Sequence, residues 1–184
     1  TVDYKLTAPE GNTAINYAKD AYTELGDLKI EVDGNEGDTF PANTTISVKV
    51  SYDAEFKNGN NTVAYKIVYG ENQTEVGNGG KIDFTFPEAA SSKTIKTGVK
   101  ITGESSGVPD GDYRSNITFV GLPVKGQKNY EFGKYDGNAL KWRVLEVDTD
   151  NKRALLVTEK AVTIKAYDAS RINVWLSSTI RTWL

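Results

Sequence analysis

Residues 46–52 read Ile46-Ser47-Val48-Lys49-Val50-Ser51-Tyr52, a strict alternation of apolar and polar side chains. Because successive side chains of a β-strand point to opposite faces, this pattern predicts a strand with one buried face. The same alternation recurs between residues 27 and 120, at Leu28–Val32, Val63–Tyr69, Ile82–Phe86, Ile95–Ile101 and Tyr113–Phe119. This part of the chain is therefore predicted to form antiparallel sheets.

Turn sequences separate these runs, at Asp33-Gly34-Asn35 and at residues 58–61, 77–80 and 109–111. They are rich in Gly, Asn, Asp and Pro, which tolerate positive φ or preset a bend. Strands at this spacing, without a helical period between them, favour an immunoglobulin-like (Ig-like) β-sandwich, which we place over residues 1–124. Residues 14–25 suit a short amphipathic helix as well as a strand, and we favour the strand.

A smaller β-rich module is predicted for residues 125–184. Pro123 and Gly126 lie in the polar segment 122–129, which indicates a boundary. Apolar runs at 140–147 and 154–158 flank a predicted hairpin loop at 148–152, and a third strand is expected at 161–166. Ser178 can cap a short helix over residues 179–184. The predicted fold class is therefore mainly β, an Ig-like sandwich followed by a smaller β-rich module that ends in a short helix.

The tail also carries a pattern of aromatic and apolar residues. Residues 130–184 resemble the N-terminal part of an uncharacterised family of bacterial and phage domains, whose members look like relatives of the lectin-like fold. The matching positions are Phe132, Gly133 and Tyr135; Trp142, Val144 and Leu145; Ala154, Leu155 and Leu156; and Trp175, Ser178, Ile180, Arg181, Trp183 and Leu184. The family has no established activity, so the resemblance brings no catalytic residues. Family domains continue past the Trp-Leu pair, so it implies a partial lectin-like module.

Residues 1–125 loosely resemble the Ig-like sandwiches of bacterial surface and pilin-like proteins. Pro109-Asp110-Gly111 leading into Ile117–Phe119 is similar to the closing strand of such domains. This is a likeness of fold and implies little about activity.

The composition excludes the commonest catalytic machinery, because the chain contains no His, no Cys and no Met. Ser-His-Asp triads, Cys-His pairs and zinc sites with His or Cys ligands cannot be built without these side chains. We therefore predict that the protein is not an enzyme, and that it has no catalytic residues, no metal site and no cofactor.

The charge is small and unevenly divided. Residues 1–125 carry 12 Lys or Arg against 18 Asp or Glu, a net charge of −6, whereas residues 126–184 carry 10 against 7, a net charge of +3. Neither part has the dense basic patch of a nucleic-acid-binding protein. No apolar run is long enough to span a membrane. The chain begins with Thr1, which we interpret as the start of a processed product, compatible with export.

Several candidate sites can be named. The acidic loop Asp33–Asp38 offers oxygen ligands for calcium but lacks the spacing of a helix-loop-helix motif, so a solvated turn is preferred. Asp148 and Asp150 fit a hairpin loop. A pair of carboxylates could in principle hydrolyse a glycosidic bond, and Lys and Ser could form a nucleophile and base, but no spacing marks such groups.

Aromatic residues and amides give further possibilities. Tyr130, Phe132, Tyr135 and Trp142 could stack on a sugar or a peptide, although core packing is the preferred interpretation. The sequons at Asn43, Asn61, Asn72 and Asn116 follow from an abundance of Asn and Thr. Asn and Lys on neighbouring strands could also form an isopeptide crosslink.

We expect a non-catalytic bacterial cell-surface or secreted protein that acts as a spacer or adhesion module. Its partner would be a host or bacterial surface glycan or protein. Two alternatives stay open, a glycan-binding module in which the C-terminal part supplies the site, and, less favoured, a carboxylate-based glycoside hydrolase. The sequence assigns no individual ligand-binding residue.

Overall fold

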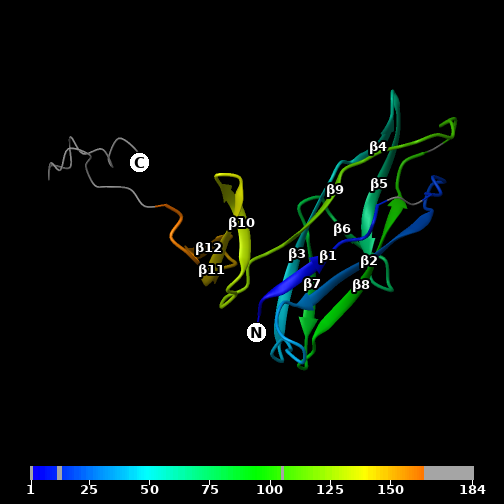
Figure 1. The fold of residues 1–184 in the computed structure, drawn as a ribbon. Coiled ribbons are helices and arrows are strands. Elements are labelled where there is room, and N and C mark those ends of the chain that lie inside the picture. Colours follow the sequence, from blue (N-terminus) through cyan, green and yellow to red (C-terminus); the bar gives the residue numbers. More distant parts are fainter. Residues whose placement is uncertain (1, 12–13, 105, 164–184) are drawn as a thin grey trace, which may run out of the picture. The chain divides into compact units, whose positions relative to one another are not determined.

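All regular structure in the described part of the chain is β. The computed structural model describes residues 2–11, 14–104 and 106–163, and these form antiparallel strands without a helix (Figure 1). Contacts divide the chain into two units, Thr1–Gln127 (unit 1) and Lys128–Leu184 (unit 2). No helix in the described ranges is long and apolar enough to cross a membrane.

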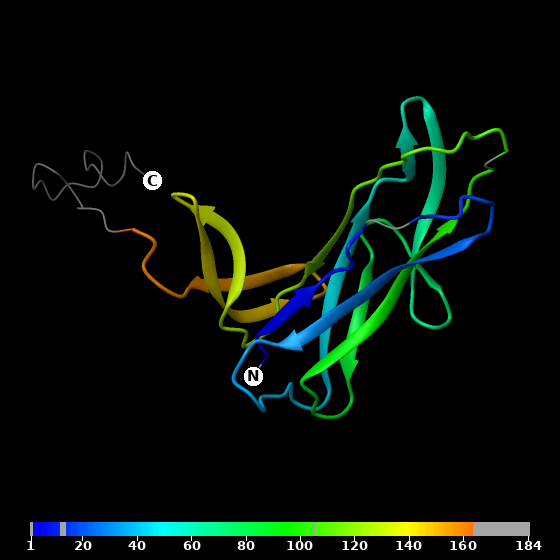
Figure 2. The same cartoon turned by 45° about the vertical axis from the view of Figure 1, so that its right-hand side comes forward.

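The larger sheet of unit 1 has the strand order β1-β2-β8-β5-β4, with β6 also paired to β5. Its strands are β1 (Tyr4–Thr7), β2 (Tyr22–Val32), β4 (Glu55–Asn58), β5 (Asn61–Tyr69), β6 (Thr74–Val76) and β8 (Ser92–Ile101). The β4–β5 hairpin turns through Gly59, whose φ of 58° suits a residue without a Cβ (Figure 2).

The smaller sheet of unit 1 has the order β7-β3-β9, with β3 in the middle. Its strands are β3 (Thr44–Tyr52), β7 (Lys81–Phe86) and β9 (Ile117–Gly121). Only Asp53 and Ala54 separate β3 from β4, so at this point the chain passes directly from the smaller sheet to the larger one.

One apolar core contains side chains from both sheets. Ile46, Val48 and Val50 of β3 are completely buried, whereas Lys49 is exposed, as the alternation predicts. They lie in one cluster with side chains of the larger sheet and of β7: Leu28, Ile30, Phe56, Val63, Tyr65, Ile67, Val76, Ile82, Phe84, Phe86, Val99 and Ile101. This core fixes the register of β3, because a slip of one residue would exchange its two faces.

Most of the alternating runs lie in strands as predicted. The run Tyr113–Phe119 is the exception, because only Ile117–Gly121 is a strand and Arg114 forms an isolated bridge with Lys57. Residues 14–21 form neither a helix nor a strand, and the strand begins at Tyr22, which pairs with Lys100 of β8. Pairing with β8 therefore decides the ambiguous segment.

Unit 2 contains the three-stranded sheet β10-β11-β12 (yellow to orange in Figure 2). Its strands are β10 (Tyr130–Tyr135), β11 (Asn138–Asp148) and β12 (Arg153–Thr158), and the predicted hairpin loop joins β11 to β12. The strand expected at 161–166 is wrong for residues 161–163, which are not in a strand, and its remainder lies outside the described residues. The helix expected over residues 179–184 also lies outside them.

The first strand of this sheet, β10, forms a hairpin with β11. Asp136 and Gly137 join β10 to β11 with φ of 47° and 78°. Positive φ at both positions is the geometry of the type I′ turn, for which Asp-Gly is a favoured pair. The dipeptide was therefore a signal for this hairpin that the sequence analysis did not use.

Replacing Phe84 of β7 tests the shared core. Phe84 is completely buried, so we expect Phe84→Ala to lower the free energy of unfolding by about 3–5 kcal/mol. Val120 of β9 is 46% exposed, so the control Val120→Ala should cost less than about 1 kcal/mol. Urea unfolding of both variants measures the difference, and equal losses would contradict a core between the sheets.

Candidate binding cleft

The four aromatic residues of unit 2 do not form a common core. Tyr130 and Trp142 are half-buried and face each other across the β10–β11 pair. Phe132 and Tyr135, by contrast, are 63% and 43% exposed, so core packing is wrong for these two side chains. The cause is a bulge between Glu131 and Lys134 that breaks the alternation of β10.

A depression of about 480 Å³ lies beside Tyr135. It is lined by the β10–β11 turn, by the first residues of β11, which include Asn138 and Lys141, and by residues that follow β12, which include Glu159 and Lys160. The indole Nε1 of Trp142 donates a hydrogen bond to the carbonyl of Phe132 over 2.6 Å, which fixes the backbone of the bulge. An exposed ring beside amide and charged groups is able to stack on a flat ligand.

Two carboxylates of the acidic loop 33–38 have partners within the protein. Asp38 Oδ2 accepts a hydrogen bond from the backbone N–H of Asn35 over 2.8 Å, and Asp33 forms an ion pair with Lys5 at 3.2 Å. A Cβ on Gly34 would lie 2.2 Å from Asp38 Oδ2, so the loop closes tightly on that carboxylate. Within the described residues, no three His, Cys, Asp or Glu side chains gather in a way that could hold a metal.

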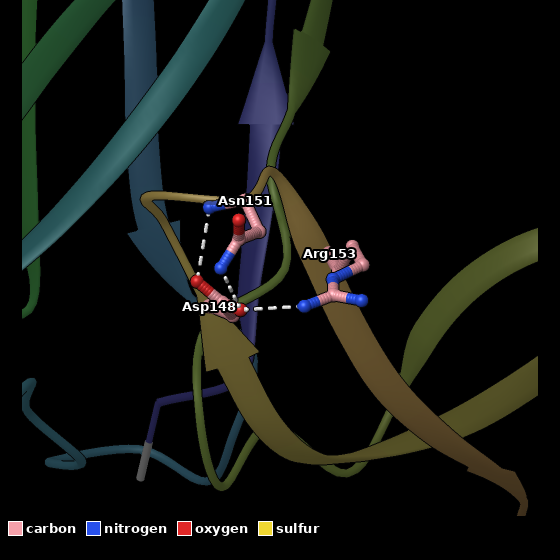
Figure 3. A network of polar contacts seen from close by, with 3 residues as sticks. All are labelled: Asp148, Asn151 and Arg153. Atoms are coloured by element: carbon pink, nitrogen blue, oxygen red, sulfur yellow. Dashed lines mark hydrogen bonds and ion pairs between the residues drawn. The ribbon is translucent and has the colours of Figure 1, made fainter.

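The hairpin loop of unit 2 is organised around Asp148, as Figure 3 shows. Asn151 donates its backbone N–H to Asp148 Oδ1 (3.0 Å) and its side-chain amide to Oδ2 (2.8 Å), and Arg153 approaches Oδ2 at 3.3 Å. These donors stabilise the ionised carboxylate and lower the pKa of Asp148, with the Asn151 bonds contributing most. Asp148 thus stabilises a turn, and Asp150 lies in the same turn.

The described lysines give little support to an isopeptide crosslink between Lys and Asn. Nucleophilic attack needs a neutral amine, which burial would favour, but none of the described lysines is buried. Glu104 and Glu75 each accept a hydrogen bond from a lysine, which raises the pKa of Lys19 and of Lys66 respectively. The sequon asparagines Asn43, Asn72 and Asn116 are exposed. The sequon expected at Asn61 is wrong, because Val63 lies two positions after it; the sequon there begins at Asn60, which is also exposed. Asn116 donates its side-chain amide to Asp53 over 3.0 Å.

A cleft of about 1130 Å³ lies in unit 1. Binding pockets for small molecules commonly measure roughly 300 to 1,000 Å³, so this cleft could hold a longer segment. One wall is formed by β9 and the residues that precede it, from Asp110 to Phe119. The other wall is formed by Ala8, Pro9, Gly11, Ala14, Ile15, Tyr17 and Leu25. Buried side chains of β4, β5 and β8 form the floor: Phe56, Val63 and Ile101.

Tyrosine hydroxyls connect the walls of the cleft. Tyr17 donates to Asp110 Oδ1 over 2.6 Å, and this hydrogen bond is the main reason for the raised pKa of Tyr17. The hydroxyls of Tyr65 and Ser115 are 2.5 Å apart, which attaches the segment before β9 to the larger sheet. Burial raises the pKa of Tyr65 to about 12, because the phenolate would lose its hydration.

The carboxyl groups whose pKa is shifted do not line this cleft. A general acid at neutral pH needs a carboxyl group with a raised pKa. The shifts resolved for carboxyl groups are downward, at Glu31 and Glu75 because of hydrogen bonds from Lys29 and Lys66, and at Asp148 as described. The cleft offers backbone, hydroxyl and apolar groups with Asp110 and Asp112 at its wall.

The sequence analysis missed this cleft because its two walls are about a hundred residues apart in the chain. Tyr17 and Asp110, for example, are 93 residues apart. Their contact depends on how the two sheets are placed, and no local spacing marks it.

The ionisation of Tyr65 tests whether its hydroxyl is buried where it meets Ser115, in the wall of the cleft. An unfolded tyrosine ionises near pH 10, so the stability due to the protonated Tyr65 is present below about pH 10. It should be lost as the pH rises from about 10 through about 12, the value in the folded chain. NMR titration of the Tyr65 ring measures this pKa, with Tyr65→Phe as the assignment control. Ionisation together with exposed tyrosines near pH 10 would be the contrary result.

The hydrogen bonds of the hairpin loop predict which substitution changes the pKa of Asp148 most. Its folded pKa lies below the usual value, so its stabilising effect is present above about pH 4 and is lost as the pH falls through the folded pKa. Asn151→Ala should raise the pKa of Asp148 more than Arg153→Gln does, because the side-chain amide of Asn151, which this substitution removes, lowers that pKa more than the Arg153 side chain does. NMR titration of the Asp148 carboxyl compares the variants, and the reverse order would show that the ion pair dominates.

Comparison with known proteins adds no relative. The chain matches none of the models of protein families and none of the curated proteins with which it was compared. The resemblance of residues 130–184 to a lectin-like family therefore stays a prediction, and the function is argued from geometry alone.

Proposed function

We propose that the protein is a non-catalytic bacterial cell-surface or secreted protein in which unit 1 is an Ig-like β-sandwich that serves as an adhesion module. The observation that carries this proposal is the large cleft on a scaffold of antiparallel sheets that have one common core. The absence of His and Cys from the chain supports a binding function over a catalytic one.

The sandwich interpretation is supported by the strand order and the core. The two sheets of unit 1 are antiparallel, and one cluster contains the inward-facing side chains of both. Two sheets that seal their apolar faces against each other are the defining feature of this architecture.

The geometry favours adhesion over a role as a spacer. A spacer in series needs its entry and exit at opposite ends of the domain. Here the Tyr4 hydroxyl of β1 donates to the carbonyl of Leu122, directly after β9, over 2.7 Å. A Cβ on Gly121 would lie 2.3 Å from that hydroxyl, so the first and last strands of unit 1 meet closely. A domain whose ends meet adds little length to a chain, but it can present a binding surface.

Glycan binding by unit 2 is a second candidate, because one specific observation favours it. Phe132 and Tyr135 are exposed aromatic rings, and Tyr135 lies beside a depression with amide and charged groups. Sugars commonly bind on such rings by stacking of their apolar faces. A glycoside hydrolase is less favoured, because no spacing in the sequence marks a catalytic pair of carboxylates.

Binding of the full chain to arrays of surface glycans and extracellular proteins tests the proposal. We expect saturable binding that survives the double variant Phe132→Ser with Tyr135→Ser, and no turnover of chromogenic glycosides. Loss of binding in the double variant would assign the activity to unit 2 instead. Absence of saturable binding, or turnover, would contradict the proposal.

A further inference from the structure

The outer edge of β9 is unpaired. Within the described residues, β9 pairs with β3 on one side only, and no strand pairs with its other side. Leu122 N–H donates to Ser47 (2.9 Å), and Asp53 N–H donates to the carbonyl of Asn116 (3.2 Å). Even-numbered residues of this segment thus direct their backbone groups toward β3. Because these directions alternate along a strand, the N–H and C=O groups of Ile117 and Phe119 point to the open edge.

This edge belongs to the cleft. Ile117 and Phe119 line it and are half-buried, whereas Val120 is exposed. In Figures 1 and 2 the yellow-green segment leading into β9 runs beside β4. The cleft therefore combines free backbone donors and acceptors with an apolar lining, the two features that β-strand addition uses.

The opposite wall leaves this edge unpaired. Residues 8–11 and 14–17 of that wall form no strand, and Pro9, which lines the cleft, has no N–H to donate. Tyr17 contacts the first wall through the side chain of Asp110, so this contact does not use the backbone groups of Ile117 and Phe119. Within the described ranges, no strand other than β3 pairs with β9. An unpaired edge of this kind is a template for an added strand.

Charge indicates which segments would fit. Asp110, Asp112 and Arg114 are the charged residues that line the cleft, so its wall carries a net negative charge. Residues 1–125 as a whole carry 12 basic against 18 acidic residues. Complementary charge accelerates encounter with a cationic partner and disfavours an anionic one.

We propose that the cleft of unit 1 binds an extended basic peptide with alternating apolar side chains, which adds as a strand to the outer edge of β9. Its apolar side chains would enter the cleft, and its Lys or Arg residues would lie near Asp110 and Asp112. This inference rests on the proposed function, because both assign binding to the cleft. Saturable binding on the arrays together with failure of the peptide assay would overturn the inference alone.

The probe is a fluorescent peptide of about nine residues, alternating Val and Thr with Lys at both ends, enough to pair along β9 and the segment before it. Fluorescence anisotropy with the full chain should show saturable binding, and a peptide with Glu in place of Lys should bind at least about tenfold more weakly. Asp112→Lys should weaken binding of the Lys peptide, whereas Glu88→Lys, an equal charge change outside the cleft lining, should not.

Two further measurements distinguish strand addition from apolar adsorption. N-methylation of alternate peptide amides should abolish binding in one alternating set and spare it in the other, because only one set faces β9. Bound peptide should slow the hydrogen exchange of the Ile117 and Phe119 amides more than that of Thr118, which already faces β3.

The contrary results are equally definite. Equal binding of the Lys and Glu peptides, indifference to the methylation pattern, or no saturable binding would each overturn the proposal. Protection of the Ile117 and Phe119 amides that grows with protein concentration, without peptide, would show that a second copy of the chain occupies the edge.

Discussion

The burial of one face of β3 is the constraint on which unit 1 depends. Ile46, Val48 and Val50 have no exposed surface, and β3 is hydrogen-bonded to β7 on one side and to β9 on the other. Its alternating side chains reach the same core as those of β5 and β8. A shift of register would place Lys49 in that core, and burying an unpaired ammonium is far more costly than any surface contact.

The same constraint positions the cleft. Because β3 fixes β9 by the pairs Val50 with Phe119 and Tyr52 with Ile117, the outer backbone edge of β9 has a defined place. The stacked rings of Phe56 and Tyr65, 4.0 Å apart, lie under the segment before β9, where Tyr65 also holds Ser115. The cleft is thus built on strands whose positions follow from the core.

Local alternation predicted the longer strands β2, β3, β5, β7 and β8 of unit 1 and part of β9, because each of them buries one face, but it did not indicate the short strands β1, β4 and β6. It failed where tertiary pairing or turns decide the structure. Residues 14–25 fit two patterns, β10 was missed although Asp136-Gly137 marks its turn, and a bulge exposes Phe132 in a run that suggested a core. The cleft could not be predicted, because Tyr17 and Asp110 meet only when both sheets are assembled.

Native-state hydrogen exchange tests most directly whether one core unites both sheets of unit 1. If it does, the slowest amides of β3 and of β8 should exchange with the same free energy, equal to that of global unfolding from urea denaturation. The sheet β7-β3-β9 would then open only together with β1-β2-β8-β5. A markedly lower free energy for the amides of β3 than for those of β8 would contradict this account, because it would mean that the two sheets unfold independently.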